Sequence, residues 1–410
     1  MKRRSIYKDA ARLLLLGLVV CFGLAACEEY PDAYKTTGGK PEISYVRVPD
    51  VASADSLLVE AYLGNTICLV GNNLRSIHEL YFNDQQAILN TSFITDHTLI
   101  VVVPKGIPEK VDNKIYLITT SNETVEYDFT TKVPDPVVNS ISCEYVADGD
   151  IATLYGDYFV DDPNVPLTIT MAGNLPVAEI VGIEKTQIKF KVPAGTQKGF
   201  INVKTIYGTG RSHFQFRDDR GMILDWDNLD ASGGWRDGSK NGWGENGISG
   251  RYTKFKGSID NGDWNEDGFS FNLWGSSNGR PEGDLFDTSD LTSLQLKFEI
   301  NILDPWSCNA MQIIFTPWST SGTNGYYDDT TIGRALWAPW TNGGSYQTDG
   351  WTTISVPLSD FKYTHTGGSA NIPEAGNYGG LSFFVWSGGI NGQPCTTEMW
   401  IDNIRVVPIE

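Results

Sequence analysis

The sequence predicts an all-β protein of several domains, and three observations support this fold class. The chain has 410 residues, which is longer than one ordinary domain. Glycine is abundant, with 43 residues, and it occurs among Thr, Asn, Val, Ile and aromatic residues, a composition typical of strands joined by many turns. Short stretches of alternating polar and apolar residues recur along the chain, as expected for half-buried strands.

The N-terminal segment 1–26 predicts an export signal. Three basic residues at 2–4 precede an apolar run at 13–24, which is shorter than the about 20 residues of a membrane-spanning helix. The run closes with Leu-Ala-Ala-Cys at 24–27, which is similar to the lipobox of bacterial lipoproteins. This resemblance implies that Cys27 becomes the lipidated first residue and the only membrane attachment.

The segment 27–40 predicts a flexible tether, since it combines charged residues, Pro, Thr and Gly. Glu28 and Glu29 resemble the surface-export signal of Bacteroidetes lipoproteins, which implies an outward-facing location in the outer membrane. Retention on the periplasmic side is the alternative, because two glutamates also suit an ordinary solvated linker.

Two related segments follow the tether, at 41–133 and 134–217. Each contains a strand that runs into a polar turn, a strand that ends at proline and a closing hairpin. These elements occupy 67–74, 97–104, 115–120 and 124–129 in the first segment, and 152–159, 185–193, 200–205 and 212–216 in the second. Their spacing predicts two immunoglobulin-like (Ig-like) sandwiches. They resemble the IPT/TIG branch of that fold, and we expect them to act as spacers.

The C-terminal segment 218–410 predicts a jelly-roll β-sandwich, because short strands alternate with long Gly-rich connections. Such a fold offers a broad sheet face and a rim of loops as places for a binding site. The expected strands are 222–226, 251–256, 268–274, 293–303, 310–316, 334–337, 351–357, 381–386 and 398–407.

The tryptophans indicate the function of this last segment. All 12 lie between Trp226 and Trp400, many of them beside Gly, Asn, Asp or Ser. An exposed indole face next to polar groups suits a pyranose ring, which stacks on the indole and hydrogen bonds to its neighbours. The formal net charge of −19 argues against nucleic acid and acidic polysaccharides as ligands. The sequence therefore predicts a binder of neutral glycans.

The densest aromatic cluster predicts the stacking platform. Prolines next to Trp306, Trp318 and Trp340 exclude a central strand there, so these rings are expected at strand ends or loops. We expect Trp306, Trp337 and Trp340 to form the platform, with Trp318 beside it. Whether the Gly/Asn-rich loops bind a structural calcium ion stays open.

Further candidates extend this platform. Asn272 and Trp274 share one face of an expected strand. Gln312 and Arg334 are candidate donors to sugar hydroxyls. Two tyrosines in a Gly/Asn/Asp loop are expected to fold over the ligand. They are Tyr326 and Tyr327.

The other tryptophans divide into two groups. Four lie in apolar strand patterns and are expected in the core: Trp226, Trp351, Trp386 and Trp400. For the three in glycine-rich loops, ligand contact and loop anchoring both stay open: Trp235, Trp243 and Trp264.

A resemblance to a known family covers the whole layout and is strongest beyond residue 290. The segments 304–318, 334–340, 350–361 and 400–408 resemble the glycan-binding domain of Bacteroidetes type-B surface glycan-binding proteins. The resemblance implies non-catalytic capture of a plant hemicellulose, such as xyloglucan or mixed-linkage β-glucan. It implies as partners a starch-utilisation-type outer-membrane transporter and surface endoglycanases, and it implies no cofactor.

Two other function classes remain as alternatives. A jelly-roll glycoside hydrolase needs two positioned carboxylates. Asp263, Glu266, Asp267, Glu282 and Asp284 lie instead in Gly/Asn-rich loops that solvation explains. A structural adhesin shares the anchor and spacers, but exposed tryptophans are costly unless a ligand covers them.

Cysteine and histidine chemistry adds little to these expectations. The four histidines show no metal-ligand spacing. An oxidising compartment permits a bridge between Cys308 and Cys395, and two free thiols are the equal alternative.

Overall fold

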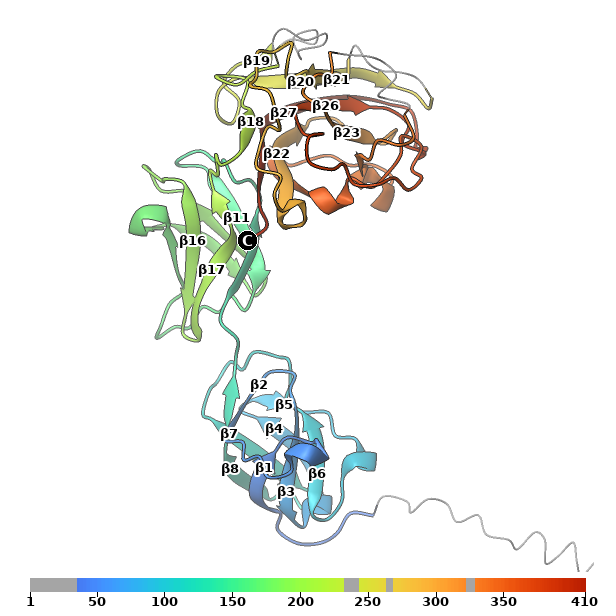
Figure 1. Ribbon diagram of the computed structural model, residues 1–410. Helices are drawn as coiled ribbons and strands as arrows, with labels where there is room; N and C mark the ends of the chain where they lie inside the picture. The colour runs from blue at the N-terminus through green and yellow to red at the C-terminus, as the bar shows by residue number, and fades with distance from the viewer. Residues whose placement is uncertain (1–34, 232–242, 263–267, 322–328) are drawn as a thin grey trace, which may run out of the picture. The chain divides into compact units, whose positions relative to one another are not determined.

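The computed structural model (Figure 1) describes residues 35–231, 243–262, 268–321 and 329–410. These residues form β-strands and short 3-10 helices, which confirms the all-β prediction. No helix within the described ranges is long and apolar enough to cross a membrane. The chain divides into two compact units, 1–134 and 135–410, and each is described by itself.

The first unit is a sandwich around one apolar core. Alternating residues of its strands, such as Leu69, Leu80 and Leu117, are fully buried in that core. One sheet has the order β1 (Glu42–Arg47), β3 (Thr66–Asn72), β6 (Thr98–Val102). The facing sheet has the order β5 (Gln85–Gln86), β4 (Ile77–Phe82), β7 (Lys114–Thr119), β8 (Thr124–Asp128). A parallel pair joins β2 (Glu60–Tyr62) to β9 (Thr130–Lys132).

The second unit begins with another sandwich that has its own core. Leu154, Ile169, Phe190 and Val203 lie in this core. Its eight strands form one continuous ladder in the order β13 (Leu175–Pro176), β12 (Thr168–Met171), β16 (Gly199–Thr205), β17 (Gly208–Phe216), β10 (Val137–Ile141), β11 (Ile151–Asp157), β15 (Gln187–Lys191), β14 (Ile180–Glu184).

The C-terminal part of the second unit is a two-sheet β-sandwich (Figure 1). One sheet has the order β19 (Trp243–Gly244), β20 (Tyr252–Ile259), β27 (Cys395–Pro408), β22 (Leu294–Ile302), β25 (Thr352–Pro357), with β18 (Met222–Leu224) paired to β27. The four-stranded sheet has the order β21 (Ser270–Leu273), β26 (Gly380–Val385), β23 (Met311–Thr316), β24 (Ala335–Trp337). All nine strands expected from the sequence are present, and β19 was not expected.

Within the described ranges, seven short 3-10 helices lie in the connections between strands. Asp50, Asn90 and Asp290 cap three of them by accepting a hydrogen bond from a backbone amide two residues ahead. They are η1 (Val51–Ser53), η2 (Leu74–Ser76), η3 (Thr91–Phe93), η4 (Ala172–Asn174), η5 (Leu291–Ser293), η6 (Pro339–Asn342) and η7 (Leu358–Asp360).

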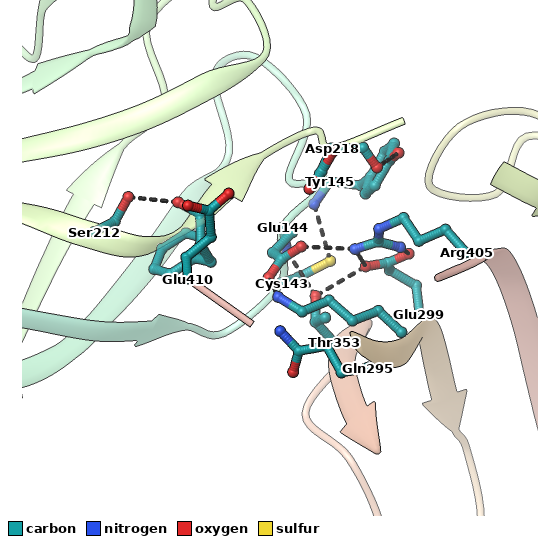
Figure 2. A network of polar contacts seen from close by, with 12 residues as sticks. Cys143, Glu144, Tyr145, Ser212, Asp218, Gln295, Glu299, Thr353, Arg405 and Glu410 are labelled. Carbon is teal, nitrogen blue, oxygen red and sulfur yellow. Dashed lines mark hydrogen bonds and ion pairs between the residues drawn. The ribbon is translucent and has the colours of Figure 1, made fainter. Parts of the chain in front are cut away.

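A buried ionic network joins the two sandwiches of the second unit (Figure 2). Arg405 is 0% exposed and forms two hydrogen bonds to Glu299, at 2.8 and 3.1 Å. Nη2, one of the two nitrogens that bond Glu299, also donates to Glu144 of the preceding sandwich at 2.7 Å. Lys297 donates to the second oxygen of Glu144. The amide of Glu144 donates to Thr353, which itself donates to Glu299. Because these buried groups form charge-assisted hydrogen bonds across the junction, they hold the two sandwiches in one arrangement.

A buried carboxyl near this network makes stability depend on pH. Burial raises the pKa of Asp402 to about 8, although Asn403 and Ser249 donate hydrogen bonds to it. The folded state therefore keeps a proton that the unfolded chain releases near pH 4. We expect stability to fall as pH rises from about 4 to about 8, by up to ~1.4 kcal/mol per pH unit from this group.

The variant Asp402→Asn keeps the shape of the protonated carboxyl but cannot ionise. Its melting temperature, followed by circular dichroism, should exceed that of the wild type by a margin that grows from pH 5 to pH 9. A margin that stays constant across this range contradicts the assignment.

Candidate functional site

The four-stranded sheet carries polar side chains on the face turned away from the core. Along each strand one set of residues, such as Phe271, Phe383 and Ile313, packs into the core. The alternate set forms the opposite face because successive strand residues point to opposite sides. We call this the outer face, and it comprises Ser270, Asn272, Ser382, Phe384, Gln312, Ile314 and Thr316, with Trp274 and Arg334 at the strand ends.

A hydrogen-bond network crosses the outer face. Arg334 donates from Nη1 to Oε1 of Gln312 at 2.9 Å. The side-chain nitrogen Nε2 of Gln312 donates in turn to the backbone carbonyl oxygens of Trp386, at 2.9 Å, and His365, at 3.3 Å. Asn272 lies beside Ser382 in the ladder. The centre of the face therefore holds polar groups that are fixed on the sheet but buried.

Three polar atoms of the outer face have no hydrogen-bond partner among the described residues. They are Nε1 of Trp274, Oγ1 of Thr316 and Oγ of Ser382, and all three are buried. A buried donor or acceptor left unpaired costs about 1–3 kcal/mol. Natural proteins leave few such groups, and each one calls for an explanation, such as a bound water, an ion or a functional role.

Two half-buried tryptophans lie beyond the two ends of β26. Trp386 follows β26, and its ring stacks on His365 with ring centroids 5.6 Å apart and an interplanar angle of 2°. Trp318 packs against Gly379, which directly precedes β26, and donates from Nε1 to the carbonyl of Arg280 at 2.9 Å. Both indoles are thus held in place at the borders of the polar face.

The sequence prediction of an exposed platform at Trp306 and Trp340 is wrong. Trp306 is 0% exposed and Trp340 is 4% exposed, and both belong to the main core. Their Nε1 atoms donate to the carbonyl oxygens of Cys308, at 2.6 Å, and Asn309, at 3.0 Å. Proline does end the strands there, but the loops fold back over the sandwich and supply these acceptors, so the rings can be buried.

Trp337 also packs on the core rather than on an open surface. Its ring lies 5.4 Å from that of Trp306 and 5.8 Å from that of Phe298, measured between centroids. It remains half-buried. Trp306, Trp337 and Trp340 therefore line the interior side of the sheet, opposite the polar face.

Four other predicted residues are brought together on the outer face. They are Asn272, Trp274, Gln312 and Arg334, and all are buried rather than open to solvent. Tyr326, Tyr327, Trp235 and Trp264 lie outside the described residues, as does Cys27.

Sequence reasoning missed Ser382 and Thr316, and it wrongly placed Trp386 in the main core, where the structure does not have it. The alternation within 381–386 carried the signal, because Leu381 and Phe383 point inward while Ser382 and Trp386 fall on the other side. Trp226 is fully buried in the core, as expected.

The expectation that Trp351 and Trp400 lie in the core is wrong, since both are half-buried outside the main core. They pack with Tyr252, with centroids 5.5 and 4.8 Å from its ring.

Of the acidic residues considered for hydrolysis, Asp284 has a structural role. Asp284 accepts hydrogen bonds from the amides of Gly376 and Tyr378, at 2.8 and 2.9 Å, and so holds a turn. Asp263, Glu266 and Asp267 lie outside the described residues. In the described part of the chain, no three His, Cys, Asp or Glu side chains are grouped as metal ligands. Cys308 and Cys395 are free thiols in this structure.

The family comparison and the comparison with solved structures both point to surface glycan-binding proteins of type B. Residues 216–408 match the family described as surface glycan-binding protein B xyloglucan binding domain. The crystal structure of a type-B surface glycan-binding protein from Prevotella bryantii is 35% identical, with a TM-score of 0.77, and the match covers 91% of this chain and 100% of that one.

Two further relatives are more distant. A type-B protein from a complex xyloglucan utilization locus in Bacteroides uniformis is 17% identical, with a TM-score of 0.46, covering 90% of this chain and 100% of that one. A Bacteroides ovatus protein described as IPT/TIG domain-containing is 29% identical over 231 residues. That match covers 52% of this chain and 46% of the relative, so the chain spans about half the length of that protein.

Proposed function

Because this chain belongs to the family of type-B surface glycan-binding proteins, we propose that it binds a neutral plant polysaccharide at the cell surface without cleaving it. Xyloglucan is the first candidate ligand, since the domain family that matches 216–408 is described by it. Mixed-linkage β-glucan is the alternative, because both polymers present the same uncharged hydroxyls and pyranose faces. The net charge of −19 is compatible with either and disfavours anionic polymers.

The observation that carries this proposal is the outer face with its three unpaired polar atoms. A sugar hydroxyl both donates and accepts, so it pairs with Trp274 Nε1, Thr316 Oγ1 and Ser382 Oγ alike. Trp318 and Trp386 border the face and offer stacking surfaces. The centre of the face is closed to solvent, so contact there requires some side chains to move.

In the cell, a lipid on Cys27 would anchor the protein to the membrane. A short tether and the Ig-like sandwiches follow Cys27 along the chain and precede the binding domain. Its partners would be a starch-utilisation-type outer-membrane transporter and surface endoglycanases. Binding concentrates long chains near this machinery, and many tethered copies raise the avidity for a repeating polymer.

Affinity electrophoresis of the full chain through gels containing xyloglucan, mixed-linkage glucan or a neutral mannan tests the proposal. We expect retardation in at least one glucan gel and no released oligosaccharide. Released product would establish the hydrolase alternative instead. Free migration in every gel would contradict glycan binding and favour the adhesin.

We expect Trp386→Ala to weaken glucan affinity about tenfold, because base–aromatic stacking of similar geometry contributes about 1–3 kcal/mol per ring. The exposed ring of Phe93, in the first unit, provides a matched control as Phe93→Ala. Isothermal titration that gives the same affinity for both variants would remove Trp386 from the site.

Ser382→Ala separates a binding role from a structural one. Since Oγ of Ser382 has no partner in the described chain, removing it should leave the melting temperature unchanged or raise it. If the hydroxyl serves a sugar, affinity should nevertheless fall about fivefold. The control is Ser258→Ala, which should leave affinity unchanged. Ser258 hydrogen bonds to Thr396, and both lie on the other sheet of the sandwich. A Ser382→Ala variant with wild-type affinity contradicts the role.

A further inference from the structure

A groove lies where the two sandwiches of the 135–410 unit meet. It has a volume of about 660 Å³, within the usual range for ligand sites. One wall comes from the Ig-like sandwich and the other from the segment that leads into β25. This groove is separate from the outer face of the four-stranded sheet, since β25 belongs to the other sheet.

The first wall is one face of β11 and β15. Tyr155 pairs with Gln187 and Thr153 pairs with Lys189, so these four side chains point to the same side. The alternate residues of the same strands, such as Leu154, are buried in the core. Tyr155 is 43% exposed. The wall is therefore a sheet surface on which one aromatic ring and the exposed Ile151 lie among polar groups.

The second wall is the segment 346–353, which contributes Tyr346, Gln347, Asp349 and Trp351. Trp351 is half-buried, and its ring contacts Tyr252 and Trp400 with centroids 5.5 and 6.2 Å away. These neighbours hold the indole in place, so stacking on it costs little ordering entropy.

The two walls are fixed relative to each other. Thr352 donates from Oγ1 to the carbonyl of Ser142 at 2.9 Å, and the amide of Thr353 donates to the same oxygen at 3.2 Å. Directly beside them lies the buried network of Glu144, Arg405 and Glu299 (Figure 2). A preformed groove binds a ligand without first closing around it.

The groove chemistry favours an uncharged, polyhydroxylated ligand. Its lining carries one cation, Lys189, and one carboxylate, Asp349, among hydroxyl and amide side chains and two isoleucines. Tyr155 provides a ring on the first wall, and Tyr346 and Trp351 provide rings on the second.

We propose that this groove is a second carbohydrate subsite, which takes a stretch of the same neutral polysaccharide and makes the adjoining Ig-like sandwich a binding domain rather than a spacer. This inference rests on the proposed function. Two sites on one rigid unit raise the affinity for a long chain without any change at the first site.

The test compares the full-length wild type with Tyr155→Ala in titrations against soluble xyloglucan and mixed-linkage glucan. We expect Tyr155→Ala to lower the affinity for the bound polymer at least fivefold, whereas Tyr155→Phe, which keeps the ring, stays within twofold. Gln187→Ala, on the same wall, should also weaken binding. The matched control is Tyr62→Ala in the first unit, where the tyrosine is 47% exposed and outside both sites.

The outcomes separate the two proposals. If the wild type binds and Tyr155→Ala binds equally well, the second subsite is excluded and the proposed function stands. If the wild type binds neither polymer, the proposed function itself fails. A loss in Tyr155→Ala that Tyr155→Phe does not share supports stacking in the groove.

Discussion

Replacing Arg405 with methionine is expected to lower the free energy of unfolding of the 135–410 unit by about 3–5 kcal/mol. Burial by itself would lower the pKa of Arg405, but Glu299 and Glu144 raise it above its ordinary value, so the guanidinium stays charged. Without it, the carboxylate of Glu299, which is 0% exposed, keeps only Thr353 as a side-chain partner in the described structure. Such an uncompensated buried charge is strongly destabilising.

Urea denaturation followed by intrinsic fluorescence measures this loss. The matched control is Lys256→Met, which removes an ion pair between an exposed lysine and the half-buried Glu398 on the same sheet. Exposed pairs contribute at most about 1 kcal/mol, so the control should change the midpoint little. Equal midpoints for the two variants would show that the network at Arg405 does not hold the sandwiches together.

The second large effect is expected for Trp306→Ala, which should destabilise the same unit by about 3–5 kcal/mol. The indole is fully buried between the two sheets, and its hydrogen bond to the carbonyl of Cys308 would be lost as well. At a temperature where the variant remains folded, its affinity for glucan should stay within twofold of the wild type, since the ring lies on the interior side of the sheet.

Trp386→Ala is the natural comparison for this variant, because a half-buried ring at the sheet border should give the opposite pattern. We expect weaker binding and a melting temperature close to the wild type. A tenfold loss of affinity in folded Trp306→Ala, measured beside a circular dichroism spectrum, would contradict the placement of the binding face.

Much of the fold could be predicted because strands leave a local pattern. Alternation in 152–159 and 381–386, and prolines or glycines between such runs, depend only on neighbouring residues. The same periodicity predicts that Asn272 and Trp274 share one face, and the pairing of β21 with β26 agrees for Asn272. The exposure of individual tryptophans has no such local signal.

Composition and periodicity thus determined by themselves that this chain is all-β and that all its tryptophans lie at or beyond residue 226, and they suggested the neutral glycan that we propose as its ligand class. Only the tertiary structure decided which indoles face the solvent. Trp306 is buried because Tyr346, forty residues later, pairs with its backbone and closes a loop over it. Trp386 stays at the surface because β26 ends there. Whether a ring is buried depends on partners brought from distant parts of the chain, and no local window contains them.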